Sequence, residues 1–233
     1  MDLLSFPDDF RVCVIGASGA IGNAFVEAFQ QNPRCAKIVA LHRNSVPAIE
    51  LCDERSIELA AEQIQSLGPF HLIIHAAGML HQSDRMPEKK LGDINMEQLH
   101  KTFMVNTFGP AIVIRHFSKM LDRERGVFAL MSAKVGSIED NRLGGWYSYR
   151  ASKAALNMLI KTAAIEIQRK QGNAVMVAMH PGTVCSALSQ PFRGAEIGRP
   201  ARQAVTEMLG VIDRLKNQDS GCFFSYDGQQ LPW

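Results

Sequence analysis

The chain has 233 residues, of which 46% are hydrophobic, and its 25 basic and 23 acidic residues give a net charge of +2. This near balance, with Lys and Arg dispersed, excludes a strong electrostatic attraction to nucleic acid or to an anionic membrane. The five scattered cysteines form no Cys-x-x-Cys pair, which argues against a disulfide framework or a zinc knot, and no metal site is predicted.

The beginning of the chain has no basic region before an apolar stretch, and no segment approaches ~18 uninterrupted apolar residues. We therefore expect a cytoplasmic protein without an export signal and without membrane insertion. His71 and His75 are four residues apart, but their segment reads as a strand, where that spacing does not form a helical metal clamp.

Short apolar runs alternate with longer amphipathic segments along the whole chain, which is typical of strand-helix units around a parallel sheet. Helices are predicted at 20–31, 55–66, 96–121, 148–170 and 200–216. Seven strands are predicted, at 11–15, 37–41, 48–51, 70–75, 127–131, 174–179 and 222–224. Their continuous apolar character suits a sheet covered on both faces. Because no linker or repeat divides residues 1–233, we expect one doubly wound, Rossmann-type α/β domain.

Two long irregular segments, 79–95 and 182–199, each follow a predicted strand. In open parallel sheets, ligands bind beyond the carboxyl ends of the strands. These two segments are therefore expected to border the functional site.

The turn after the first predicted strand is rich in glycine and leads directly into the first predicted helix. Glycines there permit a tight turn and a close approach to a pyrophosphate, while the helix N-terminus attracts phosphate. The spacing is Gly-x-x-Gly-x-x-Gly, so the common Gly-x-Gly-x-x-Gly fingerprint is not matched literally. The residues predicted to bind a dinucleotide here are Gly16, Ser18, Gly19, Ala20, Ile21 and Gly22.

The end of the second predicted strand carries His42 and Arg43 instead of an acidic residue. An acidic side chain would accept hydrogen bonds from the adenosine ribose, whereas the guanidinium of Arg43 can pair with a 2′-phosphate. NADP(H) is therefore favoured over NAD(H), although an arginine at this place can also be simply solvated. Cys52 and Asp53, after the third predicted strand, are placed to meet the adenine edge.

Tyr149 and Lys153 are four residues apart in a predicted helix and so share one face of it. A nearby ammonium favours the phenolate and lowers a tyrosine pKa from its ordinary value near ~10. Such a tyrosine can exchange a proton with a carbonyl or alcohol oxygen, which the hydroxyl of Ser132 could hold. By itself the pair is more typical of an ordinary amphipathic helix than of a catalytic site, so the inference depends on the surrounding motifs.

With the glycine turn and Ser132, Tyr149 and Lys153 in this order, the chain resembles the classical short-chain dehydrogenase/reductase family over nearly its whole length. Further motifs carry the resemblance: His75-Ala76-Ala77-Gly78, Val105-Asn106-Thr107 and His180-Pro181-Gly182-Thr183-Val184. Within that family, the segments 135–141, 144–153 and 227–233 look like the C-factor subgroup, named for a bacterial signalling protein.

The resemblance implies that Tyr149 is the general acid/base, that Lys153 lowers its pKa and binds the nicotinamide ribose, and that Ser132 positions the substrate oxygen. It further implies that Asn106 bends its helix and holds a water linking Lys153 to solvent. The remaining cofactor contacts implied by the family are Ala76, Ala77 and Gly78 near the adenosine ribose, and Pro181, Gly182, Thr183 and Val184 over the nicotinamide.

Three positions depart from the family pattern, namely Ile15, Ala20, and His75 with Ala76 in place of two asparagines. None removes a catalytic group. We expect His75 to be a buried residue that takes over the structural hydrogen bonds of the missing asparagine.

The function predicted is an NADP(H)-dependent oxidoreductase that transfers hydride between nicotinamide and a carbonyl or alcohol. The alternative is a cofactor-binding signalling or regulatory protein of the C-factor type with little or no turnover. The resemblance implies a homodimer or homotetramer that pairs through the helices at 96–121 and 148–170, and both helices carry extended apolar faces. A mainly apolar substrate pocket is predicted from Met79, Leu80, Lys134, Leu143, Trp146, Tyr147, Val184, Leu188 and Phe192.

Overall fold

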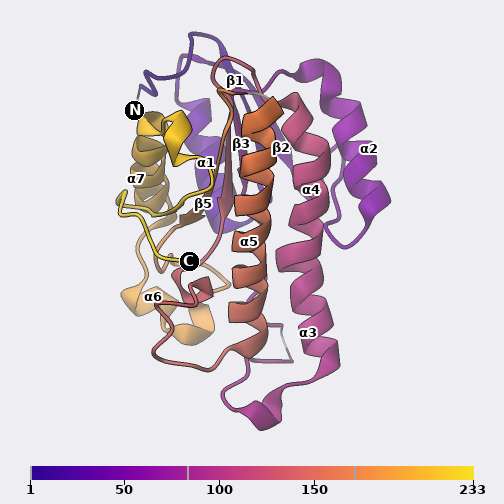
Figure 1. The fold of residues 1–233 in the computed structure, drawn as a ribbon, viewed down its shortest axis with the longest axis vertical. Helices are drawn as coiled ribbons and strands as arrows, with labels where there is room; N and C mark the ends of the chain where they lie inside the picture. Colours follow the sequence, from indigo (N-terminus) through magenta and orange to yellow (C-terminus); the bar gives the residue numbers. More distant parts are fainter. Residues whose placement is uncertain (1, 83, 171) are drawn as a thin grey trace.

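One six-stranded parallel sheet forms the centre of the computed structural model, which describes residues 2–82, 84–170 and 172–233 (Figure 1). The strand order is β2-β1-β3-β4-β5-β6, and every neighbouring pair is parallel. The strands are β1 (Phe10–Ile15), β2 (Cys35–Leu41), β3 (Leu72–His75), β4 (Val127–Met131), β5 (Val175–His180) and β6 (Phe223–Ser225). The doubly wound α/β fold expected from the sequence is thus confirmed.

The described helices occupy the predicted segments, with one interruption, except the short sixth helix, which lies in the segment 182–199 that was expected to be irregular. They are α1 (Ala20–Gln30), α2 (Glu54–Ile64), α3 (Met96–Phe103), α4 (Gly109–Phe117), α5 (Tyr147–Lys170), α6 (Gly194–Ile197) and α7 (Ala201–Arg214). A π-helical segment, Met104–Phe108, separates α3 from α4 within the predicted helix 96–121. Within the described residues, no helix has the length and apolar character needed to cross a membrane.

The predicted strand at 48–51 is wrong, and the described sheet accordingly has six strands where the sequence predicts seven. This segment is irregular and ends in a turn, in which Asp53 N donates to Glu50 O. Only Ile49 is buried there, packed into the core, while its backbone N–H donates to His42 O. The apolar run therefore reflects the packing of Ile49, and of the half-buried Leu51, against the core and not an added strand.

Alternate residues of each strand enter two separate cores, one on each face of the sheet. Cys13 and Ile15 of β1 join the core under α2, α4 and α5, whereas Val12 and Val14 join the core under α1 and α7. Figure 1 shows α4 and α5 side by side in front of the sheet, with α7 and α1 on its other side. Burial on both faces explains why the strands are continuously apolar.

The connection of the strands reverses direction around β1. The chain passes from β1 to β2 on one side and then returns to pair β3 with the other side of β1. Such a reversal opens a crevice at the carboxyl ends of the strands, where doubly wound proteins bind ligands. The glycine-rich turn follows β1 at this point.

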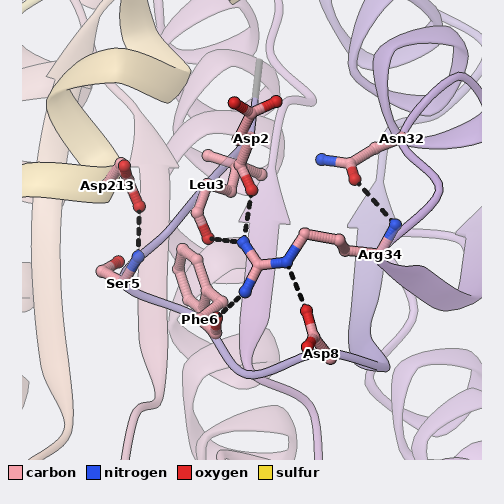
Figure 2. Close-up of polar contacts among 8 residues, drawn as sticks. All are labelled: Asp2, Leu3, Ser5, Phe6, Asp8, Asn32, Arg34 and Asp213. Carbon is pink, nitrogen blue, oxygen red and sulfur yellow. Dashed lines mark hydrogen bonds and ion pairs between the residues drawn. The ribbon is translucent and has the colours of Figure 1, made fainter.

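At the end of the sheet opposite to this crevice, the Arg34 side chain binds the N-terminal segment, as Figure 2 shows. The guanidinium donates to the backbone oxygens of Asp2, Leu3 and Phe6, with distances of 2.9 Å to Leu3 O and 2.6 Å to Phe6 O. Its Nε donates to the carboxylate of Asp8 at 2.6 Å. Because Phe6 and Leu3 are buried, these bonds hold two core side chains in place.

We expect Arg34→Ala to lower the free energy of unfolding by about 2–3 kcal/mol, because it removes several hydrogen bonds from a charged donor and frees the N-terminal segment. Urea unfolding followed by circular dichroism would measure the loss. Arg55→Ala is the control, since Arg55 is exposed and pairs with Glu58 on the same helix; its effect should stay below about 1 kcal/mol. Equal stability of the two variants would contradict this account of the segment.

Candidate active site

A cavity of about 710 Å³ lies at the carboxyl ends of the strands, where the sheet reverses direction. Residues predicted to be functional that line it are Gly19, Ala20, Ile21, Arg43, Ala76, Ala77, Gly78, Ser132, Tyr149, Lys153, Pro181, Gly182, Thr183 and Val184. Other predicted residues do not line it, namely Gly16, Ser18, Gly22, His42, Cys52, Asp53 and Asn106. Segments far apart in the sequence thus meet at one cavity.

The glycine-rich turn is shaped by two close backbone contacts. Gly16 has φ +85°, and a Cβ atom on it would lie 2.6 Å from the backbone nitrogen of Ala77. A Cβ on Gly22 would lie 2.1 Å from Gly16 O, so neither position accepts a side chain. These glycines pack the turn tightly, which leaves Gly19 as the N-cap of α1 at the cavity wall. The first turn of α1 contains no acidic residue, which favours phosphate at its N-terminus.

The side chains after β2 and before α2 have different roles. Arg43 is exposed, lines the cavity, and makes no ion pair among those found in the described residues. His42 shapes the turn, because its Nδ1 accepts from Asn44 N at 3.1 Å. The carboxylate of Asp53 caps α2 by accepting from Arg55 N at 2.9 Å.

Asn106 is completely buried within the π-helical segment and joins two other parts of the site. Its Oδ1 accepts from Met79 N at 2.8 Å, and its Nδ2 donates to Met79 O at 2.7 Å and to Ser152 Oγ at 3.1 Å. The side chain therefore ties the segment after β3 to α5. The irregular helix geometry expected around Asn106 lies at this place, because the helix widens to admit these contacts.

Ser132 and Lys153 connect the end of β4 with α5, and both are buried, with 4% and 3% of their surfaces exposed. Ser132 Oγ donates to Asn157 Oδ1 at 2.6 Å. Lys153 Nζ donates to Met131 O at 3.0 Å and lies 5.9 Å from the centre of the Tyr149 ring. Asn157 was not identified from sequence, although its spacing of eight residues from Tyr149 places it on the same helix face.

Burial dominates the protonation of this site. It raises the pKa of Tyr149 above the ordinary tyrosine value, and it lowers the pKa of Lys153 to about 8. The sequence predicts that Lys153 lowers the pKa of Tyr149, but in this structure Lys153 Nζ is directed at Met131 O and desolvation of the phenol prevails. Tyr149 thus keeps its proton at neutral pH, as a proton donor must.

The first turn of α5, which carries Tyr149, is held by a buried carboxylate from the segment after β3. Glu88 is 2% exposed; its Oε2 accepts from Ser148 N at 3.2 Å, and its Oε1 accepts from Ser148 Oγ. Its backbone oxygen accepts from Trp146 N. Acidic groups stabilise a helix N-terminus by pairing with its unbonded N–H groups. Glu88 was missed from sequence because its partners lie 60 residues away in the chain.

An apolar wall stands over Tyr149 in the cavity. The residues that pack around Tyr149 are Leu80, Ala133, Val135, Trp146, Leu188 and Phe192. Trp146 contacts Phe192 with ring centres 4.8 Å apart and contacts Tyr149 edge-on at 6.2 Å. Predicted pocket residues that do line the cavity are Met79, Leu80, Lys134, Trp146, Val184, Leu188 and Phe192. Leu143, which is 92% exposed, and Tyr147 do not line it, so those two assignments were wrong.

The segment 182–199 is closed at its base by a parallel bridge between Val184 and Arg199. The Arg199 guanidinium pairs with both carboxylate oxygens of Glu207 and lies 3.8 Å over the ring of Tyr226. Gly182 has φ +77°, and a Cβ on it would lie 2.8 Å from that ring. Tyr226 and Arg199 therefore support the Pro-Gly turn from behind.

His75, at the end of β3, is completely buried, and neither ring nitrogen has a hydrogen-bond partner among the described residues. The expectation that it takes over an asparagine's hydrogen bonds is therefore wrong. Its neighbours on the adjacent strands are Ile15 and Leu130, whose side chains belong to the core under α2, α4 and α5. Burial, with a further contribution from Lys153, lowers the pKa of His75 to about 3, so the imidazole is neutral.

Comparison with known proteins gives a direct match. Residues 48–196 match the family model described as short chain dehydrogenase. This chain belongs to the short-chain dehydrogenase family. It is therefore an oxidoreductase of a family whose members bind a nicotinamide cofactor.

Two curated relatives extend this assignment. The chain is 38% identical over 147 residues to the C-signal of Myxococcus xanthus, which covers 61% of this chain and 83% of that protein. It is 29% identical over 188 residues to 1-hydroxy-2-glutathionyl-2-methyl-3-butene dehydrogenase of Rhodococcus sp. (strain AD45), which covers 80% of this chain and 79% of that protein. The predicted resemblance to C-factor-like short-chain dehydrogenases is thus confirmed.

Solved structures show the same fold. The carbonyl reductase Sniffer of D. melanogaster superposes with a TM-score of 0.83 and 19% identity, covering 97% of this chain and 100% of that chain. The NADPH-bound carbonyl reductase from chicken fatty liver gives a TM-score of 0.82 and 24% identity, with the same coverage. At these identities the agreement concerns the short-chain dehydrogenase fold.

Replacing His75 should change how the stability of this short-chain dehydrogenase depends on pH. The folded-state pKa is about 3, whereas an unfolded histidine has a pKa of about 6.5, so below that value the unfolded chain binds the extra proton. Wild-type stability therefore falls as the pH drops from about 6.5 toward 3, and His75→Asn removes this contribution.

Between pH 6.5 and 5, we expect the wild type to lose about 2 kcal/mol relative to His75→Asn, measured by urea unfolding at each pH. Taking the difference between the two proteins cancels the other titrating groups they share. A difference that stays constant over this pH range would contradict the neutral, buried state of His75.

Proposed function

We propose that this short-chain dehydrogenase is an NADP(H)-dependent oxidoreductase that transfers hydride between the nicotinamide and a carbonyl or alcohol substrate. One observation carries the proposal: Ser132, Tyr149 and Lys153 line the same cavity as the glycine-rich turn and Arg43. We further propose that residues 1–233 act as one domain, since the segments that carry these groups are connected to one six-stranded sheet.

The cavity fits a dinucleotide along its length. Gly19 to Ile21 offer the N-terminus of α1 to a pyrophosphate, and Gly78 keeps space beside Lys153, because a Cβ there would lie 3.4 Å from Lys153 Nζ. Arg43 would pair with a 2′-phosphate, and Pro181 to Val184 would cover the nicotinamide. When bound, the reduced cofactor supplies a hydride at its nicotinamide ring.

The side chains of the chain provide the proton and hold the substrate. The carbonyl oxygen is held by Ser132 and takes a proton from Tyr149 while the carbonyl carbon gains the hydride. The phenolate left on Tyr149 recovers a proton from solvent, and Lys153, beside the ring, stabilises that charge meanwhile. In alcohol oxidation the same proton and hydride move in the opposite direction.

The apolar wall over Tyr149 selects the substrate class. Trp146, Phe192 and Leu188 surround the space above the phenol, so a small or planar apolar carbonyl compound fits best. We also propose that the protein forms a homodimer or homotetramer through the helical segment 96–121, which contains α3 and α4, and through α5. Apolar side chains are exposed around this face, including Phe108 at 48%, Met158 at 67% and Ile165 at 44%.

A second candidate is a cofactor-binding signalling or regulatory protein of the C-factor type, which the similarity to the C-signal of Myxococcus xanthus favours. The two functions differ in whether the cofactor is consumed. An NADPH oxidation assay across aldehydes, ketones and quinones separates them. Tight NADPH binding without consumption, together with a stoichiometric protein partner, would favour the second candidate.

We expect Tyr149→Phe to lower the turnover number for carbonyl reduction by roughly 10²–10⁴-fold, because the ring remains and only the proton donor is lost. NADPH affinity, measured by fluorescence titration, should change less than about 3-fold, since the substitution removes no charge. Undiminished turnover of an accepted carbonyl compound would refute the assignment of Tyr149.

Arg43→Ala tests the choice of cofactor. Loss of a charge-assisted contact to the 2′-phosphate should raise the Kd for NADPH by roughly 10–100-fold and leave that for NADH nearly unchanged. Arg55→Ala, which removes an arginine from the exposed surface of α2, is the matched control. If both cofactors lose affinity equally, Arg43 does not read the 2′-phosphate.

A further inference from the structure

Asn157 is a buried amide directly behind the proposed oxygen-holding residue Ser132. It lies on α5, eight residues after Tyr149, and only 3% of its surface is exposed. Its Oδ1 accepts the hydroxyl hydrogen of Ser132 at 2.6 Å. Its Nδ2 is buried and has no hydrogen-bond partner among the described residues. The oxygen of this amide is thus hydrogen-bonded to Ser132, while its nitrogen has no described partner.

The direction of this hydrogen bond conflicts with the role of Ser132. A serine hydroxyl has a single proton, and here that proton points to Asn157. The lone pairs that remain on Ser132 Oγ would repel the lone pairs of a carbonyl oxygen placed in the cavity. Ser132 can therefore hold a carbonyl oxygen only after its proton turns away from Asn157 and toward the substrate.

An amide is suited to this reversal because it carries an acceptor and a donor on one carbon. Turning the Asn157 amide by half a rotation brings Nδ2 to Ser132 Oγ, which then accepts a hydrogen bond and can direct its own hydroxyl hydrogen at the substrate. The number of hydrogen bonds to Ser132 stays the same. No bond of Nδ2 is broken within the described part of the chain, since it has no partner there.

The backbone on both sides is fixed while the amide turns. Ser132 N donates to Met179 O at 2.7 Å, which holds the serine at the end of β4. Lys153, one turn before Asn157 on α5, is bonded to Met131 O. Only the Ser132 hydroxyl, about its Cβ–Oγ bond, and the Asn157 amide, about its Cβ–Cγ bond, need to rotate, so the oxygen of Ser132 stays in place.

We propose that Asn157 is a positioning residue that sets the direction of the Ser132 proton: its amide accepts from Ser132 in the free site and donates to Ser132 when a carbonyl substrate is bound. This inference rests on the proposed function, in which Ser132 holds the substrate oxygen. It assigns to Asn157 no contact with substrate or cofactor.

Two substitutions at Asn157 separate this role from a purely structural one. Asn157→Asp preserves the shape, but its ionised carboxylate can only accept, so it keeps the Ser132 proton away from the substrate. Asn157→Ala removes the partner and leaves the Ser132 hydroxyl free to rotate. A structural role predicts that the Asp variant is more active than the Ala variant, whereas the proton-direction role predicts the reverse order.

NADPH oxidation with an accepted carbonyl compound is measured at about pH 8 for both variants, alone and combined with Ser132→Ala. We expect Asn157→Asp to lower kcat by roughly 10–100-fold, similar to Ser132→Ala, and Asn157→Ala by less than about 10-fold. In the Ser132→Ala background, neither substitution should lower kcat by more than about 2-fold, because the hydroxyl they direct is gone.

Full activity of Asn157→Asp, or losses that multiply in the double variants, would overturn the proposal. Thermal unfolding shows whether Asn157→Asp folds. If it does not, the effect of Asn157→Ala on kcat is compared between the wild-type and Ser132→Ala backgrounds, and equal losses in the two overturn the proposal. If Tyr149→Phe and Ser132→Ala both retain full turnover, the proposed function itself fails, which is a distinguishable result.

Discussion

The hydrogen bonds between α5 and the carboxyl end of β4 hold the candidate active site together. Lys153 Nζ bonds to Met131 O at 3.0 Å, and Ser132 Oγ bonds to Asn157 at 2.6 Å. Gly136 allows this close approach, because a Cβ on it would lie 2.6 Å from Lys153 Cβ. Strand β4 thereby fixes the position of α5, and α5 in turn places Tyr149 at the cavity.

Burial of these polar groups has a cost that their mutual hydrogen bonds offset. Asn106, Ser132, Lys153 and Asn157 are each no more than 4% exposed, and each bonds to backbone or to another buried side chain. Burial also changes the chemistry of the site, since it keeps Tyr149 protonated and lowers the pKa of Lys153 to about 8. The arrangement that fixes the geometry thus also sets the protonation states suited to proton donation.

Much of this site could be predicted from the sequence, because parallel strands bring their carboxyl ends to one edge of the sheet. The glycine-rich turn, Ser132 and Pro181 each follow a strand, so their meeting at one cavity follows from the topology. Tyr149 and Lys153 meet because of helix periodicity. These inferences need only local patterns and one rule of sheet construction.

The features that were missed depend on contacts that no local pattern encodes. Glu88 comes from an irregular segment and caps a helix 60 residues away, while Ser132 and its hydrogen-bond partner Asn157 are 25 residues apart. The segment at 48–51 was mistaken for a strand because Ile49 and Leu51 pack against the core from an irregular segment. His75 was expected to be hydrogen-bonded, but its buried ring nitrogens have no partner among the described residues.

A crystal structure with NADP⁺ bound tests the central claim most directly, namely that this cavity holds the cofactor against Tyr149. We expect the pyrophosphate at the N-terminus of α1, the 2′-phosphate on Arg43, and the nicotinamide between Tyr149 and the Pro181–Gly182 turn. A cofactor bound elsewhere, or a nicotinamide directed away from Tyr149 and Ser132, would contradict the account.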